Sequence, residues 1–171
     1  LAVDDKSVDE LLDQNLMAGF RLSQAVARRM IKQAELNTDE TDNVAIGSIV
    51  NISSIAARRA HPELLAYSIS CAASDQMTRA FAVAMAPKRI RVNAVAFGSV
   101  MSASLQESLK DDEETRDAII GKTPLNRIAS PGEVSDAVQY LASDAAGFVT
   151  GQIITVDGGR TLIDPAPYSV H

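Results

Sequence analysis

Cysteine, histidine and tryptophan are scarce or missing in this chain. Its 171 residues include one cysteine, two histidines and no tryptophan. One cysteine excludes an internal disulfide and a metal site built from several thiolates, and His61 and His171 lie too far apart in the sequence to suggest a ligand cluster. The composition therefore predicts no bound metal and fits a reducing compartment.

Long apolar runs and blocks of basic residues are also missing. No stretch reaches the roughly 18 apolar residues of a membrane span, and the segment LAVDDKSVDE at 1–10 lacks the basic and apolar regions of a signal peptide. The net charge is −6, and the 16 lysines and arginines are scattered, which disfavours nucleic-acid binding. We expect a soluble cytoplasmic protein with neither a nucleic acid nor a membrane as partner.

The chain does contain enough apolar material for a folded core. Hydrophobic residues make up 46% of its length, and a chain of this size supports one compact domain more readily than two. Residues 1–171 are therefore expected to form a single domain.

Three segments have helical patterns. Ser7-Val-Asp-Glu10 has the form of a capping box, and apolar residues at helical spacing follow it, which predicts a helix over about 7–30. Small residues, many of them alanine, predict a second long helix over 67–85. Ser130-Pro-Gly-Glu133 is a second capping box with proline at the favoured first helical position, and it predicts a helix that ends near Ser143.

The short apolar run at 46–52 is typical of a buried strand, and 153–156 has the form of a last short strand. A further strand is predicted at 90–96, where Ile90, Val92, Ala94 and Ala96 alternate with Arg91, Asn93 and Val95. Because helices separate these strands, the pattern predicts an α/β fold with a parallel sheet covered on both faces. Three strands alone leave an uncovered edge beside 46–52, and the chain starts on a helix with no strand before it. We therefore expect that a preceding part of the domain is missing from this chain.

Several segments, taken together and in order, resemble the short-chain dehydrogenase/reductase family, most closely its 3-oxoacyl-carrier-protein-reductase-like branch. The resemblance covers 11–159 and implies the C-terminal two-thirds of a Rossmann-like, doubly wound parallel sheet. Tyr67 follows Ser54 at the spacing of the family's serine and tyrosine. The matching segments are DQNL at 13–16, IVNISS at 49–54, AYSIS at 66–70, IRVNAV at 90–95 and GQIITVDGG at 151–159.

The resemblance implies an oxidoreductase that uses NAD or NADP to interconvert a carbonyl and a secondary alcohol by hydride transfer. In the family the tyrosine, here Tyr67, exchanges a proton with the substrate oxygen. Ser54 would hold the substrate carbonyl, with Ser53 as the alternative counterpart, and Asn15 would hold a water molecule. A free phenol titrates near pH 10, so proton exchange at neutral pH requires a nearby cation.

Cys71 stands where the family has the lysine that supplies this cation and also binds the nicotinamide ribose. A thiol titrates near pH 8.5 and its ionised form is an anion, so Cys71 has the wrong sign of charge. It is interpreted either as a small buried residue on an alanine-rich helix or as a reactive thiol. Arg58, Arg59 or Lys88 could supply a substitute charge, although nothing in the sequence places them beside Tyr67.

The cofactor contacts implied by the resemblance are Phe97, Gly98, Val100 and Ser102. Phe97-Gly98 replaces the family's Pro-Gly, and Ser102 stands where a threonine binds the nicotinamide amide. Phe97 is interpreted either as a bulky side chain beside the nicotinamide or as an ordinary residue of the hydrophobic core. The Gly-rich turn that holds the pyrophosphate after a first strand is not found in this sequence, so the choice between NAD and NADP stays open.

The charged segment 105–122 predicts mobile helix, and the resemblance makes 103–129 a substrate lid. Apolar residues near the expected cleft favour a substrate with an apolar part, namely Leu64, Leu65, Met101 and Leu105. The family's interface helices imply a homodimer or homotetramer through 7–30 and 67–85. Because Cys71 and Phe97 depart from the family's residues, an alternative function is that of a catalytically impaired structural or oligomerisation subunit.

Overall fold

The computed structural model describes residues 3–36 and 44–164. Helices and strands alternate in this part of the chain, with short 3-10 turns between them. The elements are α1 (Asp5–Leu12), a π-helical turn (Asp13–Met17), α2 (Ala18–Leu36), β1 (Gly47–Ser54), α3 (Leu65–Met85), β2 (Ile90–Phe97), α4 (Ala103–Ser108), α5 (Glu113–Gly121), α6 (Pro131–Ala142) and β3 (Ile153–Val156).

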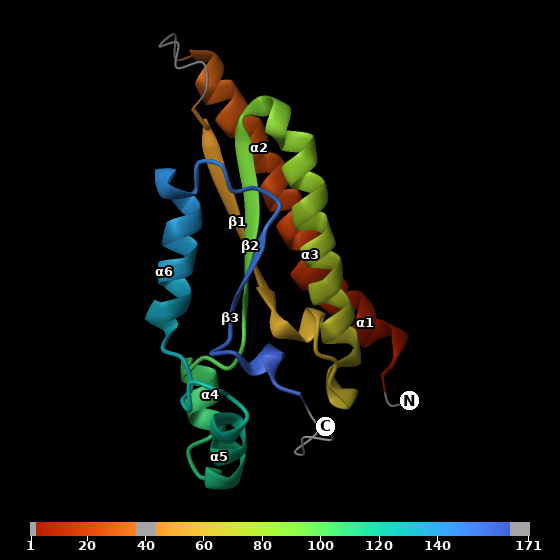
Figure 1. Cartoon of the computed structure of the whole chain (residues 1–171). Coiled ribbons are helices and arrows are strands. Elements are labelled where there is room, and N and C mark those ends of the chain that lie inside the picture. The colour runs from red at the N-terminus through yellow and green to blue at the C-terminus, as the bar shows by residue number, and fades with distance from the viewer. Residues whose placement is uncertain (1–2, 37–43, 165–171) are drawn as a thin grey trace.

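The sheet is parallel and has the order β1-β2-β3. Helices α2 and α3 lie on one face and α6 on the other, while α4 and α5 lie beyond the carboxyl ends of the strands (Figure 1). This arrangement confirms the α/β fold predicted from the alternation of apolar runs and helices. Strand β1 is an edge of this sheet, and Ile52 on it is 55% exposed, as expected for a sheet with an uncovered edge.

Two apolar clusters fill the space on either side of the sheet. Toward α2 and α3 the buried residues are Ala27, Ala82, Ile90 and Val92. Toward α6 they are Val95, Leu141 and Ala146. The small side chains of α3 allow this helix to lie close to β2, which is the most deeply buried strand.

The first helix begins earlier than predicted. The Asp4 carboxylate accepts a hydrogen bond from the Ser7 backbone N–H at 2.7 Å, so Asp4 is the N-cap and Ser7 lies within the first turn of α1. The capping box predicted at Ser7 is therefore wrong, because an aspartate three residues upstream satisfies the free N–H group. The helical path then runs to Leu36 through the π-helical turn Asp13–Met17, which contains Asn15.

Two further boundaries differ from the prediction. Strand β1 includes Ser53 and Ser54, because their backbones pair with Ala96 and Phe97 of β2. The helix predicted over 105–122 is divided into α4 and α5, because the Asp112 carboxylate accepts from the Thr115 N–H at 2.9 Å and starts a new helix.

Arg91 on β2 binds the end of α6. It is only 7% exposed, and its guanidinium donates to the carbonyls of Leu141 at 2.8 Å and Ser143 at 3.1 Å. These carbonyls belong to the last turn of the helix, where carbonyl groups lack intrahelical partners. Arg91 therefore attaches α6 to the central strand.

We expect Arg91→Met to lower the free energy of unfolding by about 1–3 kcal/mol, because the buried carbonyls at the end of α6 lose their donor. Urea unfolding followed by circular dichroism measures this change. Arg79→Met, at an exposed position of α3, is the matched control and should change the value by less than about 0.5 kcal/mol. Equal effects of the two substitutions would contradict this role of Arg91.

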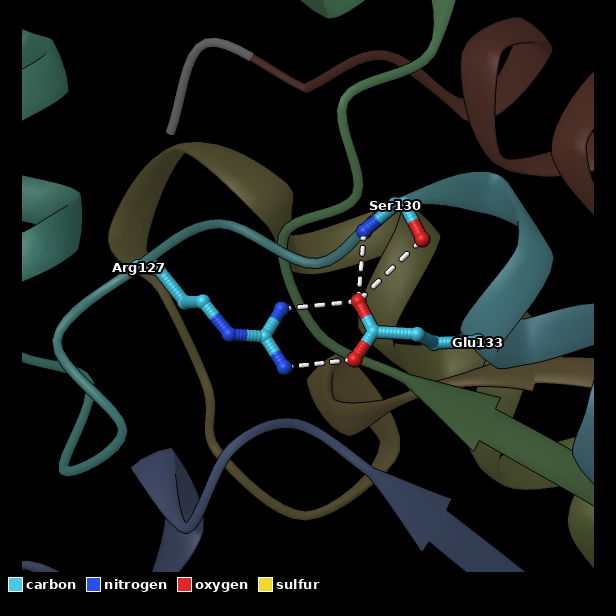
Figure 2. A network of polar contacts seen from close by, with 3 residues as sticks. All are labelled: Arg127, Ser130 and Glu133. Carbon is cyan, nitrogen blue, oxygen red and sulfur yellow. Dashed lines mark hydrogen bonds and ion pairs between the residues drawn. The ribbon is translucent and has the colours of Figure 1, made fainter.

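The capping box predicted at Ser130 is confirmed. Figure 2 shows the Glu133 carboxylate accepting from the Ser130 backbone N–H at 2.8 Å and from both terminal nitrogens of Arg127 at 2.7 and 2.5 Å. The bidentate pair with Arg127 and the Ser130 N–H lower the pKa of Glu133 to about 2. This network connects the end of segment 103–129 to the start of α6.

The low pKa of Glu133 predicts a loss of stability in acid. Its pKa is lower in the folded chain than the ordinary value of 4.5, so its contribution is complete above that value and disappears as the pH falls toward 2. We expect Glu133→Gln to lose less stability than the wild type between pH 5 and 2, as measured by urea unfolding at each pH. Glu107→Gln, an exposed position on α4, should follow the wild type, and the same curve for all three proteins would contradict the prediction.

Candidate active site

The carboxyl ends of β1 and β2 meet the start of α3 and the π-helical turn. Ser54 is the last residue of β1, Phe97 is the last of β2, and Tyr67 lies in the first turn of α3. A cavity of about 270 Å³ lies here, and Asn15, Tyr67, Cys71 and Phe97 are among its lining residues. The fold thus brings together side chains that are far apart in the sequence.

Tyr67 and Ser54 interact directly. Burial raises the pKa of the Tyr67 phenol above its ordinary value, and a hydrogen bond with the Ser54 hydroxyl acts in the opposite direction. The Ser54 hydroxyl also accepts from the Ala56 N–H at 3.2 Å, which fixes its orientation at the strand end. At neutral pH the phenol is therefore protonated and shares its site with an oriented hydroxyl.

Cys71 is a free thiol that is 4% exposed. Burial raises its pKa, hydrogen bonds with Tyr67 and Ser70 lower it, and the charge of Asp75 raises it. The net direction is upward, so the thiol is neutral at pH 7. This environment favours the interpretation of Cys71 as a small buried residue, because reactive cysteines have lowered pKa values.

Asn15 connects the π-helical turn to α3. Its Nδ2 donates to the Ser70 hydroxyl at 2.9 Å, and this hydroxyl donates to the Tyr67 carbonyl at 2.8 Å. The chain of hydrogen bonds holds the turn against the first turn of α3. Whether Asn15 also binds a water, as the resemblance implies, stays a prediction.

The predicted cofactor contacts lie between the carboxyl end of β2 and the start of segment 103–129. Phe97 is half-buried and lines the cavity, so it is not ordinary core. A Cβ on Gly98 would lie 3.0 Å from the Asp157 Cβ, so this close approach of the chains that follow β2 and β3 favours glycine.

Val100 and Ser102 shape the start of segment 103–129. Val100 pairs with Ala129 in a parallel bridge, which joins the two ends of the segment. The Ser102 hydroxyl accepts from the Leu105 N–H at 3.2 Å and caps α4. It remains able to donate its own proton to a ligand. The position of α4 and α5 beyond the strand ends (Figure 1) fits a lid, while mobility stays a prediction.

A family model described as enoyl-(acyl carrier protein) reductase matches residues 1–161. The chain belongs to the short-chain dehydrogenase/reductase family. Its sequence is 37% identical over 159 residues to 7alpha-hydroxysteroid dehydrogenase of Clostridium sardiniense, a match that covers 90% of this chain and 60% of the relative. It is 36% identical over 154 residues to 3-oxoacyl-[acyl-carrier-protein] reductase FabG of Thermotoga maritima, covering 90% of this chain and 57% of that protein.

A solved structure of the same fold is that of a gluconate 5-dehydrogenase from Burkholderia cenocepacia in complex with NADP and tartrate. The TM-score is 0.83 at 31% sequence identity, and the match covers 95% of this chain and 59% of that one. This similarity confirms the Rossmann-like fold over the matched residues. The chain spans about three fifths of the length of these relatives.

Neither Arg58, Arg59 nor Lys88 takes the place of the family's lysine beside Tyr67. Arg58 donates to the Thr155 hydroxyl at 3.1 Å, and Arg59 donates to the Thr161 carbonyl, so both guanidinium groups are bound on the side of β3. Lys88 follows the far end of α3, which puts it about 30 Å along the helix axis from Tyr67. The described residues that line the cavity carry no charge.

Within 3–36 and 44–164, histidine, cysteine, aspartate and glutamate form no group of three that could hold a metal. In the same residues no helix combines the length and the apolar character needed to cross a membrane.

Sequence reasoning missed a polar layer between β1 and α3. Asn51 lines the cavity and donates to the Thr78 hydroxyl at 2.9 Å, and Ser53 and Ser74 line it too. Asp75 on α3 is 4% exposed. The signal was present, because Asn51 and Ser53 are polar residues two apart in β1 and so lie on one side of the strand, and Asp75 interrupts an alanine-rich helix.

Proposed function

We propose that the full-length protein is an NAD(P)-dependent oxidoreductase of the 3-oxoacyl-carrier-protein-reductase-like branch, which interconverts a carbonyl and a secondary alcohol. The observation that carries the proposal is the contact of the Ser54 hydroxyl with the Tyr67 phenol beside a cavity. Both groups can donate a hydrogen bond to one substrate oxygen, which is what carbonyl reduction requires.

The nicotinamide, when bound, supplies or accepts the hydride. Gly98, Val100 and Ser102 would hold it, since the glycine removes side-chain bulk and Ser102 offers a hydroxyl. Tyr67 would donate its proton to the substrate oxygen during reduction, and Ser54 would orient that oxygen. Phe97 would form the cavity wall beside the ring.

The raised pKa of Tyr67 predicts different pH profiles for the two directions. Reduction uses the protonated phenol and should proceed at neutral pH, whereas alcohol oxidation needs the phenolate and should increase with pH up to at least about pH 10. Initial rates of both directions from pH 6 to 10.5 test this. An oxidation rate that is already constant below pH 9 would contradict it.

The proposed substrate is a small carbonyl or alcohol compound with an apolar part. Leu64 and Leu65 precede Tyr67 and are 43% and 41% exposed, and Met101 and Leu105 at the start of segment 103–129 are half-buried. Exposed apolar side chains at the entrance of a site favour contact with an apolar ligand.

We further propose a homodimer or homotetramer through the helices that include 7–30 and 67–85. An apolar cavity of about 430 Å³ lies between α2 and α3, lined by side chains that include Phe20, Ile31 and Phe81. Phe20 and Phe81 pack edge to face with ring centres 5.3 Å apart. A second copy would cover this face. Ala80→Glu should give monomers in analytical ultracentrifugation, and an unchanged mass would contradict this interface.

The function is tested on the full-length protein by fluorescence titration with NADH and NADPH, followed by turnover of ketone and alcohol pairs. Ser54→Ala should lower turnover on the order of 100-fold with little change in cofactor affinity. Ser135→Ala, at an exposed position on α6, is the control and should behave as the wild type. If the protein bound neither NADH nor NADPH, the proposal would be contradicted.

The alternative function is a catalytically impaired structural or oligomerisation subunit. The neutral cavity around Tyr67 and Cys71 favours it, because no cation of the described lining residues stabilises the phenolate. A stable oligomer that binds neither nicotinamide cofactor would support this alternative.

A further inference from the structure

The helix that carries Tyr67 begins without a side chain that holds its first turn. The N-cap of α3 is Leu64, which makes no side-chain hydrogen bond to the start of the helix. The 3-10 turn Pro62–Leu64 before it is capped by His61, which lies on the exposed surface. Because helix ends open most readily, the position of the Tyr67 phenol against Ser54 depends on contacts from other elements.

Ser70 makes such a contact. It is fully buried, and its hydroxyl donates to the Tyr67 carbonyl at 2.8 Å. The same oxygen accepts from the Asn15 Nδ2 at 2.9 Å. A serine hydroxyl has one proton to donate, so the two bonds fix its orientation, with the proton directed to α3 and a lone pair directed to the π-helical turn.

The bond from Asn15 distinguishes Ser70 from an ordinary helical serine. A serine hydroxyl that binds a carbonyl one turn earlier in its own helix is a common local contact and fixes nothing outside that helix. Here a second element takes part, because Asn15 belongs to the π-helical turn Asp13–Met17, which packs against α3. Such turns are frequent at functional sites. The π-helical turn is therefore attached, through Ser70, to the backbone of Tyr67.

We propose that Ser70 is a positioning residue for Tyr67 and that Asn15 acts through it. Together they hold the first turn of α3 so that the phenol stays in contact with the Ser54 hydroxyl. This inference rests on the proposed function, because Ser70 acts on the reaction only through Tyr67. A reacting group displaced by about 1 Å can lower a rate by about 100-fold, so the loss of this attachment is measurable as turnover.

The test is a double-mutant cycle in the full-length protein, made of Asn15→Leu, Ser70→Ala and the two combined. Leucine has nearly the shape of asparagine and lacks its N–H donors. Each single variant should lower kcat by about 10- to 100-fold and change KM by less than about threefold, because proton donation is displaced and binding is not. The double variant should lose no more than the more severe single variant, because both substitutions break one chain of bonds.

Three results of the cycle would overturn the proposal. The first is a kcat in Ser70→Ala within about twofold of the wild type. The second is a pair of losses that multiply in the double variant, since independent sites behave in that way. The third is a loss confined to Asn15→Leu, which would leave Asn15 with a role of its own, such as holding a water.

Ser135→Ala is the matched control. The Ser135 hydroxyl donates to the Pro131 carbonyl at 3.2 Å in the first turn of α6, and within the described residues no other element bonds to it. This variant should keep the kcat of the wild type. Circular dichroism checks the folding of each variant, and Ser70→Cys, which keeps the shape with a weaker donor, replaces Ser70→Ala in the cycle if the alanine variant does not fold.

Carbon-13 labelling of the tyrosine ring separates failure of this inference from failure of the proposed function. The NMR signal of the Tyr67 ring should shift toward that of free tyrosine in Asn15→Leu and in Ser70→Ala, and stay unchanged in Ser135→Ala. This shift without turnover in any protein, the wild type included, would support the attachment of Tyr67 and contradict the oxidoreductase. An unchanged signal in a protein that turns over its substrate would overturn this inference alone.

Discussion

Replacing Cys71 by lysine is expected to raise the alcohol-oxidation rate of the full-length protein at pH 7 by at least about 100-fold. The new ammonium would lie one helical turn after Tyr67, whose pKa is raised by burial and further by Cys71. A cation at this position favours the phenolate and lowers the pKa of the phenol. The ammonium would also accompany the buried Asp75, which reduces the cost of burying it.

Initial rates with NAD and with NADP measure this effect. Cys71→Met is the matched control, because methionine extends the side chain without adding charge. The control should leave the rate within about twofold of the wild type. An equal gain in both variants would show that filling the cavity matters and charge does not, and no gain in either would contradict the assignment of Tyr67 as the proton carrier.

Tyr67→Phe in the Cys71→Lys background is expected to lower turnover by about 1,000-fold or more. Phenylalanine keeps the ring in the cavity wall and removes the only phenol among the described lining residues. Cofactor affinity, measured by fluorescence titration, should change by less than about threefold. Tyr140→Phe on α6, where the ring is 43% exposed, is the control and should retain the full rate. A rate within tenfold of the parent would contradict the role of Tyr67.

Much of the fold follows from local patterns. The strands predicted at 90–96, from alternating residues, and at 153–156 agree with β2 and β3. The helix predicted over 67–85 agrees with α3. The π-helical turn Asp13–Met17 was not predictable, since its sequence resembles that of an ordinary helix and its geometry depends on packing against α3.

The candidate site also has features that the sequence predicted and features that it did not. The spacing of Ser54 and Tyr67 predicted that they belong together, and the structure places them in contact. No local pattern predicted that Ser53 of β1 and Ser74 of α3 would line one cavity, because this depends on how α3 lies against β1. The N-cap role of Ser102 was also missed, and in the structure its hydroxyl accepts from the Leu105 N–H at the start of α4.

The pKa of the Tyr67 phenol tests most directly the claim that this site has an acid-base tyrosine without its cation. The sequence has three tyrosines, so carbon-13 labelling of the tyrosine ring allows each phenol to be titrated by NMR in the full-length protein. We predict a pKa above the ordinary value near 10 in the wild type, and a pKa lower by at least about one unit in Cys71→Lys. A wild-type pKa at or below 10, or the same pKa in both proteins, would contradict the claim.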